Sequence, residues 1–172
     1  MSLPTAVSDT SVLINLDHLD LLPALSHLYK EVLVPAPGRV EFLRGESETS
    51  RKTALDLLTK TGFFSPCDDF DSVSVKLYHD WKMTGAEAEA LSQLKMRNAD
   101  VLLIDEKIGR RIAEREMRRV QGTVSILARL HRLRFTDFKN SIVRLKSEKN
   151  MRISEQAIRR AFEIEMGGNY ES

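Results

Sequence analysis

Acidic side chains that directly follow short apolar stretches are the residues of this sequence best suited to chemistry. Asp9 ends a predicted strand over 5–9, and Asp105 ends the apolar run 99–105. The carboxyl ends of neighbouring parallel strands meet at the edge of the sheet where open α/β folds bind ligands, so these two carboxylates are expected to converge. Clustered like charges repel and are costly to desolvate, which a bound cation usually explains. Oxygen ligands without His or Cys favour Mg²⁺ or Mn²⁺.

Each of these acids, taken alone, has a simpler interpretation. An aspartate at the end of a strand often caps the helix that follows, and we give this interpretation even weight for Asp9 and for Asp105. In the segment after Asp9, we predict a helix over 10–16 with Thr10 or Ser11 as its cap. The metal hypothesis therefore depends on several acids meeting, rather than on any one of them.

The stretch 62–71 is the most loop-like part of the sequence. Because it is rich in turn formers, we interpret its three aspartates as solvated loop residues rather than as a metal cluster. Aromatic residues in and after this stretch could stack on nucleic-acid bases, but packing against the sheet is the favoured interpretation. These aspartates are Asp68, Asp69 and Asp71, and the aromatic residues are Phe70, Tyr78 and Trp81.

Composition places the chain among globular proteins. Of its 172 residues, 30% are charged and 42% are hydrophobic, which is ordinary for a folded domain. The apolar runs are too short to span a membrane, and the N-terminus does not resemble a signal peptide. A single cysteine, Cys67, excludes an internal disulfide and a cysteine-rich metal site. We therefore expect a cytoplasmic protein that does not associate with membranes.

Charge is distributed unevenly although the net charge is only +1. The segment 105–134 holds 9 basic and 4 acidic residues, a local net charge of +5. Such an excess could face a phosphate backbone, or it could simply be a solvated helix face. Within this segment, Arg110 and Arg111 are the candidates for phosphate binding, because the forked guanidinium suits phosphate oxygens.

Hydrophobic periodicity and helix-capping signals predict alternating strands and helices. The expected strands are 5–9, 31–34, 99–105 and, more weakly, 119–123. The expected helices are 10–16, 19–29, 38–44, 48–60, 84–97, 106–117, 124–133, 137–147 and 155–166, with 73–81 left open between helix and strand. This alternation predicts an α/β fold with a mostly parallel sheet, followed by two closing helices.

Caps are predicted at three further helices. Thr84 and Glu87 form a capping box at the start of the helix over 84–97. Thr136 and Ser154 are expected to cap the two closing helices. We expect one domain over 1–172, with an α/β core over 1–134 and a helical hairpin over 135–168.

Several stretches together resemble PIN domains, in the same order and spacing as in that family. No single stretch is specific, but the resemblance covers nearly the whole chain. The subgroup that it resembles most is described as predicted nucleic-acid binding. The stretches are Val7 to Ile14, Val34-Pro35 followed by Glu41, Glu87 to Leu91, Leu102 to Glu106, Gly109 to Arg111, and Gly122-Thr123.

This resemblance implies a three-layer α/β/α fold and a metal-dependent endoribonuclease that uses Mg²⁺ or Mn²⁺. Many PIN domains are VapC-like toxins of toxin–antitoxin pairs, so RNA, an antitoxin protein and a second copy of the chain are the expected partners. A PIN module that binds nucleic acid or protein without cutting is the alternative. A phosphatase of the haloacid dehalogenase type is set aside, because that chemistry needs a second aspartate where Ser11 stands.

By the same resemblance, four acids would hold the metal and carry catalysis. Eighteen residues separate the third acid from the fourth, as in the family, but Ala86 stands where the subgroup has glycine directly before the third acid. Glu89 therefore remains the alternate third acid. Thr10 or Ser11 would bind a ligand carboxylate or a phosphate. The four acids are Asp9, Glu41, Glu87 and Asp105.

Overall fold

A five-stranded sheet forms the centre of the molecule. The computed structural model describes residues 2–43 and 60–167, and the predicted helix over 48–60 lies almost wholly outside them. The strand order is β3-β2-β1-β4-β5, and every pairing is parallel. The predicted α/β class with a parallel central sheet is therefore confirmed. The strands are β1 (Thr5–Ser8), β2 (Glu31–Pro35), β3 (Phe64–Cys67), β4 (Val101–Leu103) and β5 (Arg119–Gln121).

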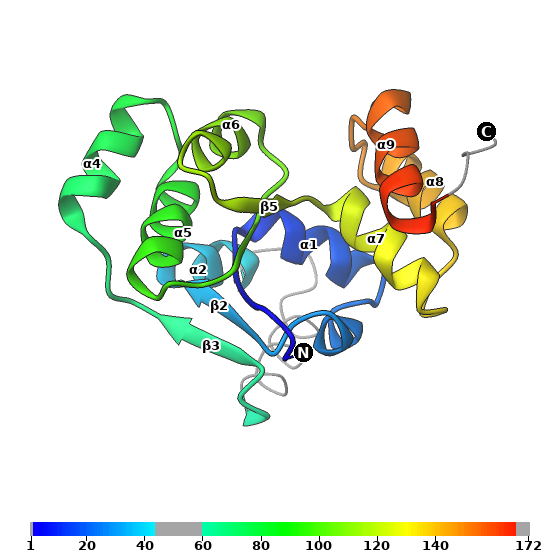
Figure 1. Cartoon of the computed structure of the whole chain (residues 1–172), viewed down its shortest axis with the longest axis horizontal. Helices are drawn as coiled ribbons and strands as arrows, with labels where there is room; N and C mark the ends of the chain where they lie inside the picture. Colours follow the sequence, from blue (N-terminus) through cyan, green and yellow to red (C-terminus); the bar gives the residue numbers. More distant parts are fainter. Residues whose placement is uncertain (1, 44–59, 168–172) are drawn as a thin grey trace.

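Helices connect the strands and continue after the last one (Figure 1). The segment 73–81, left open between helix and strand, is helical, and the predicted helix over 19–29 is reduced to one short 3₁₀ helix. None of the described helices is long and apolar enough to cross a bilayer. The helices are α1 (Thr10–His18), η1 (Pro23–His27), α2 (Ala36–Leu43), α4 (Ser72–Asp80), α5 (Gly85–Met96), α6 (Lys107–Arg115), α7 (Thr123–Arg132), α8 (Phe138–Glu148) and α9 (Glu155–Met166).

Alternate residues of the central strands supply two separate apolar clusters. Ala6 and Leu103 belong to the cluster that contains side chains of α1, α7, α8 and α9. Val7 and Leu102, which point the other way, belong to the cluster that contains side chains of α4, α5 and α6. Figure 1 shows these two groups of helices on opposite sides of the molecule. Burial of both strand faces explains the continuously apolar sequence of β4 and gives the three-layer α/β/α arrangement.

The prediction of a loop over 62–71 is wrong in part, because strand β3 lies within this segment. Its proline and the aspartates that follow it have the composition of a loop, so the sequence did not predict this strand. Pro66 cannot donate to a neighbour, yet it is tolerated because β3 is the outermost strand and pairs only with β2. After β3 the chain does form a loop, and Asp71 caps α4 by accepting hydrogen bonds from the backbone N–H groups of Val73 and Ser74.

Two predicted helix caps are each displaced by one residue. Asp9, rather than Thr10 or Ser11, caps α1, because the strand ends at Ser8 and Asp9 has the extended backbone of a cap. The interpretation of Asp9 as a helix cap is therefore confirmed. Asp137, rather than Thr136, caps α8 by accepting from the N–H of Asn140 at 2.8 Å. The cap of α9 at Ser154 is as predicted.

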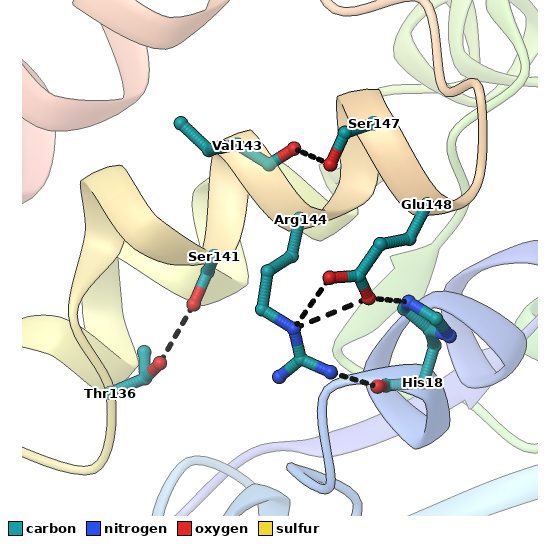
Figure 2. Close-up of polar contacts among 7 residues, drawn as sticks. All are labelled: His18, Thr136, Ser141, Val143, Arg144, Ser147 and Glu148. Carbon is teal, nitrogen blue, oxygen red and sulfur yellow. Dashed lines mark hydrogen bonds and ion pairs between the residues drawn. The ribbon is translucent and has the colours of Figure 1, made fainter.

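Helix α8 is fixed against the end of α1 by a polar cluster (Figure 2). The imidazole of His18 lies 2.6 Å from the Glu148 carboxylate, and Arg144 donates to the carbonyl of His18 at 3.1 Å. At the start of α8, Thr136 and Ser141 share a hydrogen bond of 2.7 Å. Because α1 also carries Asp9 at its other end, the C-terminal helices support the helix from which the candidate site is built.

Candidate functional site

The candidate site lies where the strand order reverses. The chain runs from β1 to β2 on one side and later returns to β4 on the other, so the β1–β4 boundary is the switch point of the sheet. Open α/β folds bind ligands at this point. Asp9 directly follows β1, and its N–H donates to the carbonyl of Leu103 in β4 at 3.0 Å. Asp105 follows β4 by two residues, so both predicted strand-end acids lie at this boundary.

Asp9 is a deeply buried carboxylate, with only 3% of its surface exposed. The Ser11 hydroxyl lies 3.0 and 2.9 Å from its two oxygens, and the N–H of Val12 donates to it at 3.2 Å. Burial, followed by repulsion from Asp105 and more weakly from Glu87, raises the pKa of Asp9 to about 8. In the part of the chain that the structure describes, no basic side chain forms a salt bridge with Asp9.

Asp105 is held by three donors. The backbone N–H of Thr123 donates to it at 2.7 Å, the Thr123 hydroxyl donates at 2.5 Å, and the Asn15 amide donates at 3.1 Å. Thr123 begins α7 and Asn15 lies in α1, so two helices on one side of the sheet orient this carboxylate. Sequence reasoning gave neither residue a role. The position of Thr123, directly after a predicted strand and a glycine, could have indicated that it contacts the site. Nothing in the sequence around Asn15 indicates such a contact.

Gly122 leaves the space in which Arg110 approaches Asp105. A Cβ at this position would lie 2.6 Å from a terminal nitrogen of Arg110 and 2.7 Å from an oxygen of Asp105. The Arg110 guanidinium is half-buried and donates to the carbonyl of Ile104 at 3.5 Å. Arg111, the other predicted phosphate ligand, is exposed on α6.

The two glutamates expected to join the site line a cavity together with Asp9. This first cavity has a volume of about 310 Å³, and Glu41 from α2 and Glu87 from α5 lie in its wall. Glu87 is 8% exposed and also accepts from the N–H of Thr84 at 2.9 Å, as the predicted capping box requires. Thr10 and Ser11 line the same cavity.

Glu89, the alternate third acid, lies elsewhere. It does not line the first cavity but a second cavity of about 570 Å³, whose wall also includes Glu41. Burial raises the pKa of Glu89. Because Glu87 shares a cavity with Asp9, we favour Glu87 over Glu89 as the third acid.

The donor set has the chemistry of a site for a hard cation. Its side chains are carboxylates, and burial, followed by repulsion from Asp105, raises the pKa of Asp9. Across residues 2–43 and 60–167, no three acidic, His or Cys side chains lie close enough together to hold one ion. Mg²⁺ suits this arrangement, because one or two carboxylates usually hold it and water completes its shell. Asp105 is not among the residues that line the cavity shared by Asp9, Glu41 and Glu87.

Comparison with known proteins identifies the family. The family model described as PIN domain matches residues 5–165, which is nearly the whole chain. A search of curated proteins finds no match. The match includes all five strands and the acids at the β1–β4 boundary. On this evidence, the chain belongs to the PIN-domain family.

Proposed function

We propose that this protein is a metal-dependent endoribonuclease, which hydrolyses RNA phosphodiesters to leave a 3′-hydroxyl and a 5′-phosphate. PIN domains are generally nucleases, and the chain belongs to that family. The observation that carries the proposal is the burial of Asp9 beside Asp105 and Glu87 without a basic partner among the described residues. Burial of an acid without a basic partner is costly, and acids with strongly shifted pKa values concentrate at functional sites.

Asp9 and Asp105 would hold Mg²⁺ or Mn²⁺, with Glu41 and Glu87 completing the shell. When bound, the ion supplies a water of lowered pKa and offsets the charge of the phosphate. The protein's part is orientation: Ser11 holds the Asp9 carboxylate, and Thr123 and Asn15 hold that of Asp105. Water adds to phosphorus, and the 3′-oxygen leaves with a proton.

Arginines beside the cavity would position the RNA. Arg110 lies next to Asp105 over Gly122, so its guanidinium can reach a phosphate bound near that acid. Arg111 faces solvent on the same helix and would bind a more distant phosphate. Thr10 and Ser11 line the cavity and complete the predicted substrate contacts.

A non-catalytic PIN module is the second candidate. The observation that favours it is the separation of the acids, since no three of the described ones lie close enough to share an ion. Such a module would bind RNA or protein through the same surface without cutting.

Cleavage of single-stranded RNA in the presence of Mn²⁺ decides between the two candidates. We expect the wild-type protein to cleave and the Asp9→Asn variant to cleave at least about 100-fold more slowly. The control variant Asp80→Asn alters an exposed acid outside both cavities and should cleave at the wild-type rate. Equal rates for wild type and Asp9→Asn would remove catalysis from this site.

Two predicted partners extend the proposal. As the toxin of a toxin–antitoxin pair, the protein would arrest growth when expressed alone, and co-expression of an antitoxin would relieve the arrest. As a homodimer, it would show a mass in solution near twice 19.6 kDa. A monomer at high protein concentration would refute the dimer.

A further inference from the structure

The second cavity continues the first cavity. Both are lined by Glu41, Thr84 and Ala86, so a ligand could pass from one to the other without leaving the surface. At about 570 Å³ the second cavity is within the range of small-ligand sites. An RNA strand with a phosphate at Asp9 would have a neighbouring nucleotide within reach of this space.

An exposed aromatic ring forms part of its wall. Phe70 is 47% exposed and lines the second cavity, so the expectation that it packs against the sheet is wrong. Tyr78 is fully buried, as expected, and Trp81 is 44% exposed but lines neither cavity. Apolar wall residues such as Pro37 and Val40 accompany the ring. An accessible aromatic face in an apolar hollow suits a flat, unpaired nucleobase.

The charged groups of this wall are all carboxylates, those of Glu41, Asp68 and Glu89. Asp68 is paired with Arg39 at 2.6 Å. The side chain of Glu89 forms neither a hydrogen bond nor a salt bridge with any residue that the structure describes. Ionised carboxylates only accept hydrogen bonds, so this wall repels phosphate and favours a base edge rich in N–H donors.

We propose that the second cavity binds an unpaired nucleobase next to the cleaved phosphate, with Phe70 stacked on its face and Glu89 accepting its N–H groups. Guanine fits best, because N1–H and N2–H are adjacent donors that one carboxylate can accept together. Uracil fits worst, because carbonyl oxygens flank its single N–H donor. This subsite rests on the proposed function, since it assumes that the ligand is RNA.

Binding and cleavage are measured separately with short single-stranded RNAs that carry guanine or uracil at one position of an otherwise constant sequence. Affinity is measured by fluorescence anisotropy in an Asp9→Asn background, and cleavage is measured with Mn²⁺ in the otherwise wild-type protein. Phe70→Ala should weaken binding of the guanine RNA about 5- to 100-fold, whereas Trp81→Ala, the matched exposed aromatic, should not. Glu89→Gln should reduce an approximately tenfold preference for guanine over uracil to near equality.

The outcomes separate the two proposals. Equal affinities for Phe70→Ala and Trp81→Ala, in a protein that cleaves RNA, overturn the subsite and leave the nuclease standing. Binding that depends on Phe70 and prefers guanine, in a protein that does not cleave, supports the subsite and refutes the nuclease. Failure of the wild-type protein to bind either RNA overturns both.

Discussion

Replacement of Asp9 by asparagine should stabilise the metal-free protein. The folded chain holds a proton on Asp9 up to about pH 8, whereas an ordinary aspartate releases it near 3.8. At pH 7 the unfolded state has released this proton about three pH units above its ordinary pKa, while the folded state still holds it. The free energy of unfolding is therefore lowered by at most about 4 kcal/mol. Water and local relaxation ease buried charges, so we expect Asp9→Asn to add about 2 kcal/mol to the free energy of unfolding. Asparagine keeps an oxygen that accepts from Ser11 and Val12.

The sign of the pH dependence follows from proton binding. Because the folded state binds the proton more tightly than the unfolded state, the stability of the wild type falls as pH rises from about 4 to about 8. The advantage of Asp9→Asn should therefore be smallest near pH 4, grow up to about pH 8 and then level off. Asp80→Asn, at an exposed acid that lines neither cavity, should show no such growth.

Urea denaturation at pH 5, 6, 7 and 8 with a chelator present measures this difference. Added Mn²⁺ should reverse the order of stability, because ligand at about 100 times its dissociation constant stabilises a binding protein by about 2.7 kcal/mol. Equal unfolding free energies and equal pH slopes for wild type and Asp9→Asn in the chelator would refute the interpretation of Asp9 as an uncompensated buried acid.

Two further substitutions test the support of Asp105. Gly122→Ala places a Cβ within 3 Å of Arg110 and Asp105, and we expect Mn²⁺-dependent cleavage to fall by about 100-fold. Asp80→Asn, at an exposed acid that lines neither cavity, should keep the wild-type rate. Unchanged cleavage by Gly122→Ala would contradict the role of this glycine. Thr123→Val removes the hydroxyl that donates to Asp105, and we expect it to weaken Mn²⁺ binding, measured by calorimetry, by about 10- to 100-fold. Thr123→Ser keeps the hydroxyl and should recover the wild-type affinity. Equal affinities for the valine and serine variants would exclude this role of the hydroxyl.

The sequence correctly predicted those helices and strands that are specified by their own residues, through hydrophobic pattern or capping residues. The apolar run at β4 predicted a strand covered on both faces, and the Thr84–Glu87 pattern predicted the start of α5. The strand β3 was missed because its proline and the aspartates after it have the composition of a loop, and only its place at the sheet edge makes Pro66 acceptable. At α1 the sequence left two predictions for the cap, and the one at Asp9 is confirmed whereas the one at Thr10 or Ser11 is wrong, because Asp9 serves as both strand-end acid and helix cap.

The candidate site was predictable only to the extent that motif spacing marks it. Family resemblance singled out the four acids, but spacing alone did not separate Glu87 from Glu89, which line different cavities. The donors that orient Asp105 lie 18 and 90 residues away in sequence, at Thr123 and Asn15. Such long-range contacts have no periodicity and become visible only when the helices are packed on the sheet.

The central proposal is that Asp9 and Asp105, which follow β1 and β4, hold one divalent cation together with Glu41 of α2 and Glu87 of α5. A crystal soaked in Mn²⁺ and measured by anomalous diffraction tests it most directly. We expect a peak bound by Asp9 and Asp105, with Glu41 and Glu87 joined to it directly or through water. A peak at any other position, or none between Asp9 and Asp105 at saturating Mn²⁺, would contradict this claim.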